Sequence, residues 1–230
     1  MSALEEPLEL AGGGRVLFTS RAHGNLSSVG GEGAEQGAKA RGRLLALIGA
    51  RRLLRGYQVH GSEVRRVTSD PPADQAVPSD HADGQATNLV GIAPLVLSAD
   101  CLPVALGGAG AVAALHAGWR GLAAGVLEQG VSALRELSAG AGVAEITAVI
   151  GPGAGPCCYE VGEEVHTAFA GSHRYGQNID LRAIARDRLL ATGITEVRDV
   201  EVCTICDERY FSHRREGKHA GRQGGVAWLS

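Results

Sequence analysis

The chain has 230 residues, of which 44% are hydrophobic and 20% are charged, and its formal net charge is −3. This composition is typical of a folded globular protein and excludes a disordered chain. The small negative charge excludes a general attraction to nucleic acid or to an anionic membrane surface, so we expect neither as a partner.

The N-terminus and the cysteines indicate a cellular compartment. The first ten residues, MSALEEPLEL, lack the basic region and apolar core of a signal peptide, and no apolar run in the chain is long enough to span a membrane. The five cysteines form an odd number, which favours reduced thiols when no export signal is present. We expect a cytoplasmic protein that is a monomer or a small homo-oligomer, with a flexible segment over residues 1–14.

The first half of the chain alternates between strand and helix patterns. Residues 15–20 (RVLFTS) predict a strand, and residues 32–50 predict a helix that ends near Gly49. Residues 53–69 predict a pair of strands broken at Gly61. The stretch 70–88 is rich in Pro and Asp, which is typical of a turn-rich surface segment, but apolar strands follow it at once and it does not divide the chain.

The second half mixes strands and helices in the same way. Its strand-like segments are 95–98, 102–106, 112–116, 145–153, 196–205 and 224–230. Its helical segments are 120–137, 157–170 and 180–193. Several neighbouring strands are predicted to be antiparallel. The pattern favours an α/β fold of the layered α+β kind, with residues 1–230 in a single domain.

Cysteine and histidine side chains stand at the ends of predicted strands. Cys101 adjoins one strand and His116 ends the strand that returns beside it after a turn at 107–110, so the two are roughly opposite each other. His60 ends another predicted strand. One Cys and two His suit zinc, and three protein ligands leave a fourth position open, as in catalytic zinc sites. The alternative is that Cys101 is a buried small apolar residue and the histidines are hydrogen-bonded polar groups.

Four further residues are candidates for contact with a substrate or its phosphate. Arg120 opens a predicted helix, where its guanidinium can hold a phosphate through two hydrogen bonds or pair with an acidic neighbour. Asp100 can hydrogen-bond a ligand histidine or cap a turn. Arg214 and Arg215 belong to a cationic run that can reach an anion or form a solvated face.

Several blocks of the sequence, taken together, resemble the YfiH or laccase-domain family, which is also called multicopper polyphenol oxidase-like. The blocks are QVHGSEV, ADGQAT, ADCLPVAL, HAGWRGL, GPGAGPCCYEVG and CTICDERYFSHRREGKHAGRQGGVAWL. The resemblance implies a single domain with central mixed β-sheets flanked by helices on both outer faces. It also implies a metal site of His60, Cys101 and His116 that holds Zn²⁺, with Cu²⁺ as an alternative metal in the same site.

The same resemblance implies a purine nucleoside enzyme. Family members cleave adenosine, inosine, guanosine or methylthioadenosine with phosphate and deaminate adenosine, so the expected partners are a small purine nucleoside and phosphate. We expect His60, Cys101, His116 and Arg120 to be catalytic.

Two other activities stay open. One is a cysteine hydrolase or peptidoglycan-precursor editing enzyme that uses Cys101 as nucleophile and His116 as base. The other is a copper-dependent phenol oxidase, which the eight histidines, with no H-x-H pair among them, disfavour.

The remaining cysteines offer a second zinc-ligand spacing. Cys203, Cys206, His213 and His219 form the pattern C-x2-C-x6-H-x5-H. In the family motif only the first of these cysteines is usual. We therefore expect neither a metal nor a disulfide at the Cys203–Cys206 pair.

Overall fold

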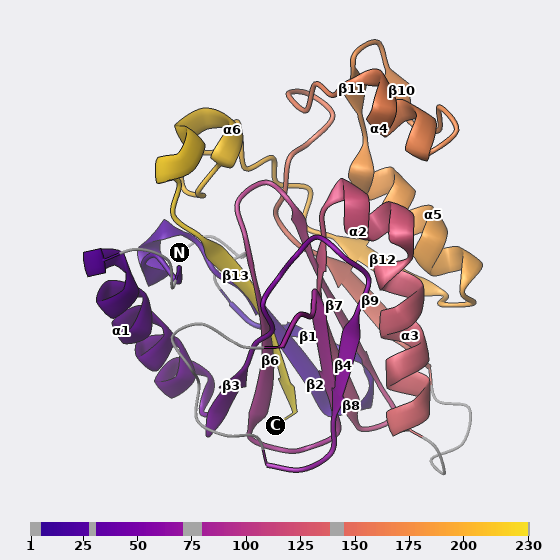
Figure 1. The fold of residues 1–230 in the computed structure, drawn as a ribbon. Coiled ribbons are helices and arrows are strands. Elements are labelled where there is room, and N and C mark those ends of the chain that lie inside the picture. Colours follow the sequence, from indigo (N-terminus) through magenta and orange to yellow (C-terminus); the bar gives the residue numbers. More distant parts are fainter. Residues whose placement is uncertain (1–5, 28–30, 71–79, 139–144, 230) are drawn as a thin grey trace.

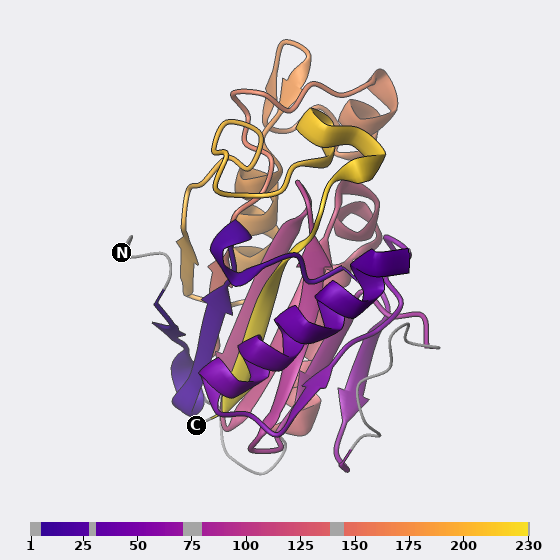
Figure 2. The ribbon, with the colours of Figure 1, turned by 90° about the vertical axis from the view of Figure 1, so that its left-hand side faces the viewer.

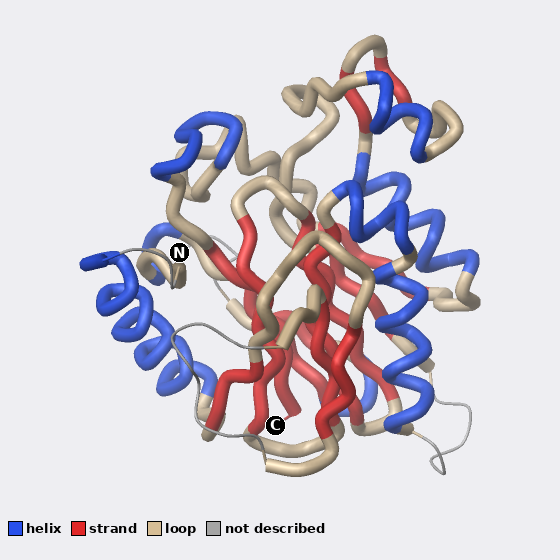
Figure 3. Tube along the Cα trace, viewed as in Figure 1, coloured by secondary structure: helices blue, strands red, loops and turns tan. Residues whose placement is uncertain are grey.

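Two β-sheets stand face to face in the centre of the molecule, and helices cover the outer face of each (Figures 1 and 3). The computed structural model describes residues 6–27, 31–70, 80–138 and 145–229, so part of the predicted turn-rich segment, residues 71–79, lies outside the described residues. The predicted single α/β domain, with mixed sheets between outer helices, is confirmed.

The first sheet has five strands in the order β1-β2-β13-β6-β3. Its strands are β1 (Leu8–Glu9), β2 (Gly14–Phe18), β3 (Arg52–Leu54), β6 (Ile92–Ser98) and β13 (Gln223–Leu229). Neighbours are antiparallel except β3 and β6, which are parallel. The helix α1 (Gly31–Ile48) crosses the outer face of this sheet (Figure 2).

The second sheet has six strands in the order β12-β9-β7-β8-β5-β4. Its strands are β4 (Val64–Val67), β5 (Gly84–Thr87), β7 (Leu102–Gly108), β8 (Ala111–Ala117), β9 (Thr147–Ile150) and β12 (Glu196–Asp199). The helices α3 (Val126–Leu137) and α5 (Leu181–Ala191) pack on its outer face. The shorter elements are α2 (Trp119–Ala124), α4 (Glu163–Ala168), α6 (His213–Glu216), the hairpin of β10 (Arg174–Tyr175) and β11 (Asn178–Ile179), and the 3₁₀ turns η2 (Ala11–Gly13), η3 (Arg21–His23) and η4 (Gly217–His219).

The period-two alternation of strand side chains separates the core into layers. Along β2, Val16 and Phe18 point into the space between the two sheets, whereas Leu17 points to the layer under α1. Along β13, Ala227 lies between the sheets and Trp228 lies under α1. Both faces of these strands are therefore buried, which is why they read as apolar runs rather than as clean alternation.

The predicted strand 196–205 is a strand only in β12 (Glu196–Asp199), and three further predicted elements also differ from the structure. Residues 55–63, predicted as strand, form a loop, and Val59 is 45% exposed. The predicted helix 120–137 is divided between α2 and α3 by Gly125, whose φ of 95° lies in the left-handed region that favours glycine. The predicted helix 157–170 is helical only in α4, because residues 157–162 form turns and extended backbone.

Part of the N-terminal segment that we expected to be flexible is tied to the fold. β1 pairs with β2, and the backbone N–H of Ala11 donates to Thr147 Oγ1 at 2.8 Å. Among the described residues, none of the helices is both long enough and apolar enough to cross a membrane.

Candidate metal centre

The strand order of the six-stranded sheet brings the predicted ligands to one edge. β4, β5 and β7 begin at this edge and β8 ends there, because β4 and β5 are parallel and β8 is antiparallel to both of its neighbours. His60 lies in the loop that precedes β4, Cys101 directly precedes β7, and His116 is the penultimate residue of β8. Residues that are far apart in sequence therefore meet at neighbouring strand ends.

The ligand atoms of His60, Cys101 and His116 all lie within 4.8 Å of one another. The two imidazole rings have centroids 4.9 Å apart and an interplanar angle of 70°, so their edges converge rather than stack. His116 is opposite Pro103 in the β7–β8 ladder, and Cys101 is therefore its diagonal neighbour rather than its direct partner. The three predicted ligands thus share one site, at which His60 is exposed and His116 is buried.

A fully buried carboxylate, Asp83, holds this arrangement together. It directly precedes β5, and β5 pairs with β8, so Asp83 lies beside His116. Asp83 Oδ1 is 2.8 Å from His116 Nδ1, and the His116 backbone N–H donates to the Asp83 carbonyl at 2.7 Å. A carboxylate can only accept here, so Nδ1 of His116 carries a proton, and Nε2 is the ring nitrogen at which a metal ion can take the place of a second proton.

The same carboxylate fixes the loop that carries His60. Asp83 accepts the backbone N–H groups of Val59, His60 and Gly61 at 3.0, 2.9 and 2.8 Å. These amides point to a side chain instead of to a neighbouring strand, which is why residues 55–63 are a loop and not the predicted strand. Gln58 ties the loop to β6 through two hydrogen bonds with the backbone of Leu97, at 2.7 and 2.8 Å.

The charges at the centre favour an ionised thiol. Burial opposes ionisation of Cys101, but His116 and His60 outweigh it and lower the pKa of the thiol to about 6. Burial also opposes protonation of His116, but Cys101 and Asp83 outweigh it and raise its pKa to about 9. Asp83 itself is buried, yet its hydrogen bonds to His116 and to the loop amides keep its pKa below the usual value.

These residues fit a metal ion of the zinc type. A thiolate and two imidazoles form the donor set, and Asp83 leaves Nε2 of His116 free to coordinate. The backbone also makes room for the ligands at Gly118, where a Cβ would lie 2.9 Å from Cys101 Sγ and 3.0 Å from His60 Cδ2. Three protein ligands leave one tetrahedral position for a substrate or water.

Asp100 does not contact the histidines. Its φ is 88°, and its carboxylate accepts hydrogen bonds from Thr204 Oγ1 and from the Arg214 backbone N–H, both at 2.7 Å. The role of orienting a ligand histidine, which the sequence allowed for Asp100, belongs to Asp83. Sequence reasoning missed Asp83, although it lies inside the ADGQAT block that contributes to the family resemblance.

The three arginines predicted to contact an anion have different surroundings. Arg120 is exposed, with its guanidinium 4.3 Å from the Trp119 ring centre. Arg214 donates to the Glu160 carbonyl at 2.8 Å and lies 4.8 Å from the ring centre of Tyr159. Arg215 is bonded to three backbone carbonyls and to Glu216, so its guanidinium is committed to the loop.

Tyr159 is a second residue that the sequence reasoning did not single out. Burial and the negative charge expected on Cys101 raise the pKa of its phenol. Tyr159 therefore lies close enough to the candidate metal centre to interact with the charge of Cys101. Its ring also carries Arg214 on one face. The CCYEV segment that holds it was predicted as helix, which obscured the direction of the side chain.

Comparison with known proteins gives the same fold and the same family. A family model described as multi-copper polyphenol oxidoreductase laccase matches residues 14–230. A protein of Xylella fastidiosa named purine nucleoside phosphorylase is 38% identical over 226 residues, which cover 90% of this chain and 84% of that protein. The purine nucleoside phosphorylase YfiH of Escherichia coli is 39% identical over 185 residues, covering 75% of this chain and 72% of that protein.

The similar solved structures extend over nearly the whole chain. The crystal structure of the Neisseria meningitidis protein NMB0706 superposes with a TM-score of 0.81 at 28% identity, covering 97% of this chain and 99% of the other. YlmD from Geobacillus stearothermophilus superposes with a TM-score of 0.80 at 26% identity, covering 95% and 92%. With a family model that spans residues 14–230 and relatives above 30% identity over most of its length, the chain belongs to the YfiH-like family described as multi-copper polyphenol oxidoreductase laccase.

Proposed function

We propose that the protein is a zinc-dependent enzyme of purine nucleosides. It would cleave adenosine, inosine, guanosine or methylthioadenosine with phosphate, and it would deaminate adenosine. The observation that supports this most directly is the three-ligand centre with an open fourth position, in a chain whose relatives are named purine nucleoside phosphorylases. The donor set of one Cys and two His favours Zn²⁺, with Cu²⁺ as the alternative metal.

In this proposal the metal ion and the residues around it have different roles. Bound zinc would supply Lewis acidity, which polarises or positions the attacking phosphate or water. Asp83 keeps the His116 proton on Nδ1, and the Val59–Gly61 amides hold His60 in place through the same carboxylate. In phosphorolysis a phosphate oxygen bonds to C1′ of the ribose, and the purine leaves with the electrons of the glycosidic bond and takes up a proton.

Arg120 is our candidate for holding the phosphate. It follows the His116 strand by a few residues, it is exposed, and the Trp119 ring supports its guanidinium. Within the described parts of the chain no hydrogen bond or ion pair engages that guanidinium, so its donors remain for an anion. Arg214 and Tyr159 border the centre near Asp100, where we place the nucleoside.

The direct test combines metal analysis with product analysis. The chain is purified without added metal, its zinc and copper are counted, and it is incubated with adenosine in the presence and absence of phosphate. We expect adenine and ribose 1-phosphate only with phosphate. Inosine should form in both cases, and with phosphate part of it should be cleaved further to hypoxanthine. A His60→Ala/His116→Ala variant should lose the metal of this centre and both products. If the zinc-loaded chain forms neither product, the proposal is wrong.

A cysteine hydrolase remains the second candidate because one observation favours it. Cys101 can act as nucleophile and His116 as its base, and Asp83 orients His116. Cysteine hydrolases use the same chain of contacts. Metal binding separates the two functions, because a thiolate that coordinates zinc cannot attack a substrate. A metal-free chain that is fully active on an amide and is inactivated by alkylation of Cys101 would favour the hydrolase.

A further inference from the structure

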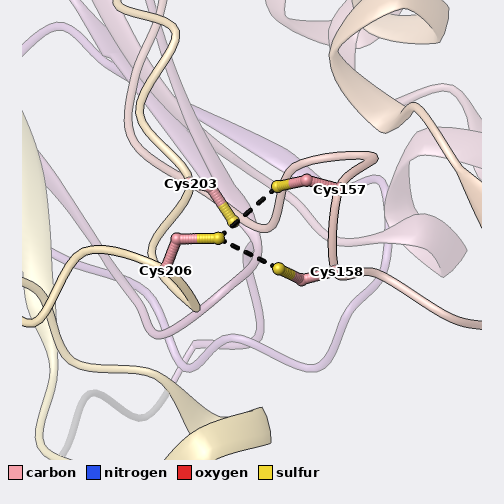
Figure 4. A group of neighbouring side chains, drawn as sticks. All are labelled: Cys157, Cys158, Cys203 and Cys206. Carbon is pink, nitrogen blue, oxygen red and sulfur yellow. Dashed lines mark hydrogen bonds between the residues drawn. The ribbon is translucent and has the colours of Figure 1, made fainter.

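A second group of ligands lies outside the candidate metal centre. It consists of Cys157, Cys158, Cys203 and Cys206, whose sulfur atoms all lie within 4.8 Å of one another (Figure 4). From the sequence we expected no metal at Cys203 and Cys206, because their only partners in the spacing pattern were His213 and His219. Neither histidine belongs to the group, but two other cysteines do, and this reopens the question of a metal. The two turn residues Cys157 and Cys158 take their place.

The sheet explains why these four residues meet. β9 and β12 are parallel neighbours, so both end at the same edge of the six-stranded sheet. The loop after β9 carries Cys157 and Cys158, and the loop after β12 carries Cys203 and Cys206. The two loops stay paired beyond the strands through a bridge between Gly153 and Cys203.

The sulfur spacing suits a tetrahedral metal ion. Sγ of Cys206 is 3.5 Å from that of Cys157 and 3.0 Å from that of Cys158. Four thiolates around zinc, each at about 2.3 Å, place their sulfurs about 3.8 Å apart. A disulfide needs a sulfur separation of about 2.05 Å, and all five cysteines of the chain are free thiols.

The backbone around Cys203 favours a thiolate. The Gly155 N–H donates to Cys203 Sγ at 3.3 Å, and the amides of Ile205 and Cys206 also interact with this sulfur. Two arginines bind the backbone on either side of Cys203, since Arg182 donates to the Val202 carbonyl and Arg215 donates to the Thr204 carbonyl. The amide hydrogen bonds to Cys203 Sγ are of the kind that orient a thiolate ligand and offset part of its negative charge.

We propose that Cys157, Cys158, Cys203 and Cys206 form a second metal site, a structural tetrathiolate centre for Zn²⁺. Binding one zinc ion releases to solvent the protons that the four thiols still carry, and no electrons are exchanged. The protein fills all four positions, so this site has no place for a substrate. Cys157 and Cys206 are exposed, which gives the ion a path from solvent.

The site would act by fixing two loops that border the candidate metal centre. Asp100, next to Cys101, is held from both loops: its carbonyl accepts the Ala154 N–H at 2.7 Å, and its carboxylate accepts the Thr204 hydroxyl at 2.7 Å. Zinc between the loops would therefore stabilise the backbone beside Cys101. This role is independent of the reaction that takes place at the other centre.

Counting zinc in matched variants tests the proposal. The wild-type chain should hold two zinc ions, and Cys203→Ser/Cys206→Ser should hold one. The control His60→Ala/His116→Ala should also hold one, and the combined variant none. If the wild-type chain holds a single zinc that only the histidine variant removes, the second site is wrong while the first stands. Iron in place of zinc would overturn the metal assignment.

A second measurement tests the site even if Cys203→Ser/Cys206→Ser does not fold, because it keeps all four cysteines of the group. In a Cys101→Ser chain the four clustered cysteines are the only thiols, and zinc should protect them from alkylation. We expect alkylation to be at least about 10-fold faster after a chelator has removed the metal. Equal rates before and after chelation, or a disulfide within the group in protein purified under reductant, would reject the site.

Discussion

Asp83 is the residue on which the candidate metal centre depends, because it binds His116 and the loop that carries His60. The variant Asp83→Asn tests this role. It keeps the shape of the side chain but removes the negative charge that favours a proton on Nδ1 of His116. We expect zinc affinity at this centre to fall by about 10- to 100-fold. Competition with a chromogenic chelator measures it, and Asp100→Asn is the control, since Asp100 contacts Thr204 and Arg214 instead. An equal loss in both variants would contradict the assignment.

Arg120 is the residue that should separate the two proposed reactions. Only phosphorolysis has a phosphate for its guanidinium to hold, so Arg120→Ala should lower the phosphate-dependent rate constant and affect deamination much less. The loss of a charge-assisted pair corresponds to about 1.5–3 kcal/mol, or about 10- to 150-fold. Initial rates at varied phosphate measure it.

Two controls accompany the Arg120 variant. Zinc content should stay constant because Arg120 is not a ligand, and Arg120→Lys should retain part of the effect because it keeps the charge but not the planar fork. If both reactions fall together with zinc retained, Arg120 shapes the site or contacts the nucleoside. If neither falls, the anion is held elsewhere.

At the scale of a single element, α1 contains two glycines whose replacement should have opposite effects. Gly42 is exposed and nothing lies within 4 Å of the place a Cβ would take, so Gly42→Ala should stabilise the protein by about 0.5–1 kcal/mol through helix propensity. Gly37 is buried, and a Cβ there would overlap the Ser27 carbonyl oxygen, so Gly37→Ala should destabilise it by about 1–3 kcal/mol.

Chemical denaturation of the two variants tests this pair. Both introduce the same methyl group into the same helix, so each is the control for the other. A stabilising Gly37→Ala would show that α1 does not pack on the Ser27 backbone as described.

At the scale of the whole molecule, the side chains packed between the two sheets join them into one domain. Phe18 is its only aromatic member in the described core, 5% exposed and packed with Ala105, Val149 and Ala227. Phe18→Ala should lower the free energy of unfolding by about 3–5 kcal/mol, because small neighbours cannot close the cavity.

Equilibrium unfolding in urea measures this loss, with Leu47→Ala as the control. Leu47 is 63% exposed, and its truncation should change stability by no more than about 0.5 kcal/mol. If Phe18→Ala lowers the free energy of unfolding by less than the burial of one methyl group contributes, about 0.8 kcal/mol, the sheets are not held together by this layer.

The sequence by itself determined much of the fold and the ligand set. Apolar runs and helical periodicity located most strands and helices, and the family resemblance selected His60, Cys101 and His116. Those signals are local, so they depend on residues that are neighbours along the chain or along one helix face. They also gave the layered α/β class, because mixed strands and amphipathic helices can bury their faces in few ways.

Only the tertiary structure decided which distant residues meet. The β5–β8 pairing places Asp83 beside His116, and the parallel β9–β12 pairing brings Cys157 and Cys158 to Cys203 and Cys206. Strand order and register result from packing across the whole sheet, and no short window of sequence carries them. The loop at 55–63 was misread as strand for the same reason, since the carboxylate that captures its amides lies more than 20 residues away.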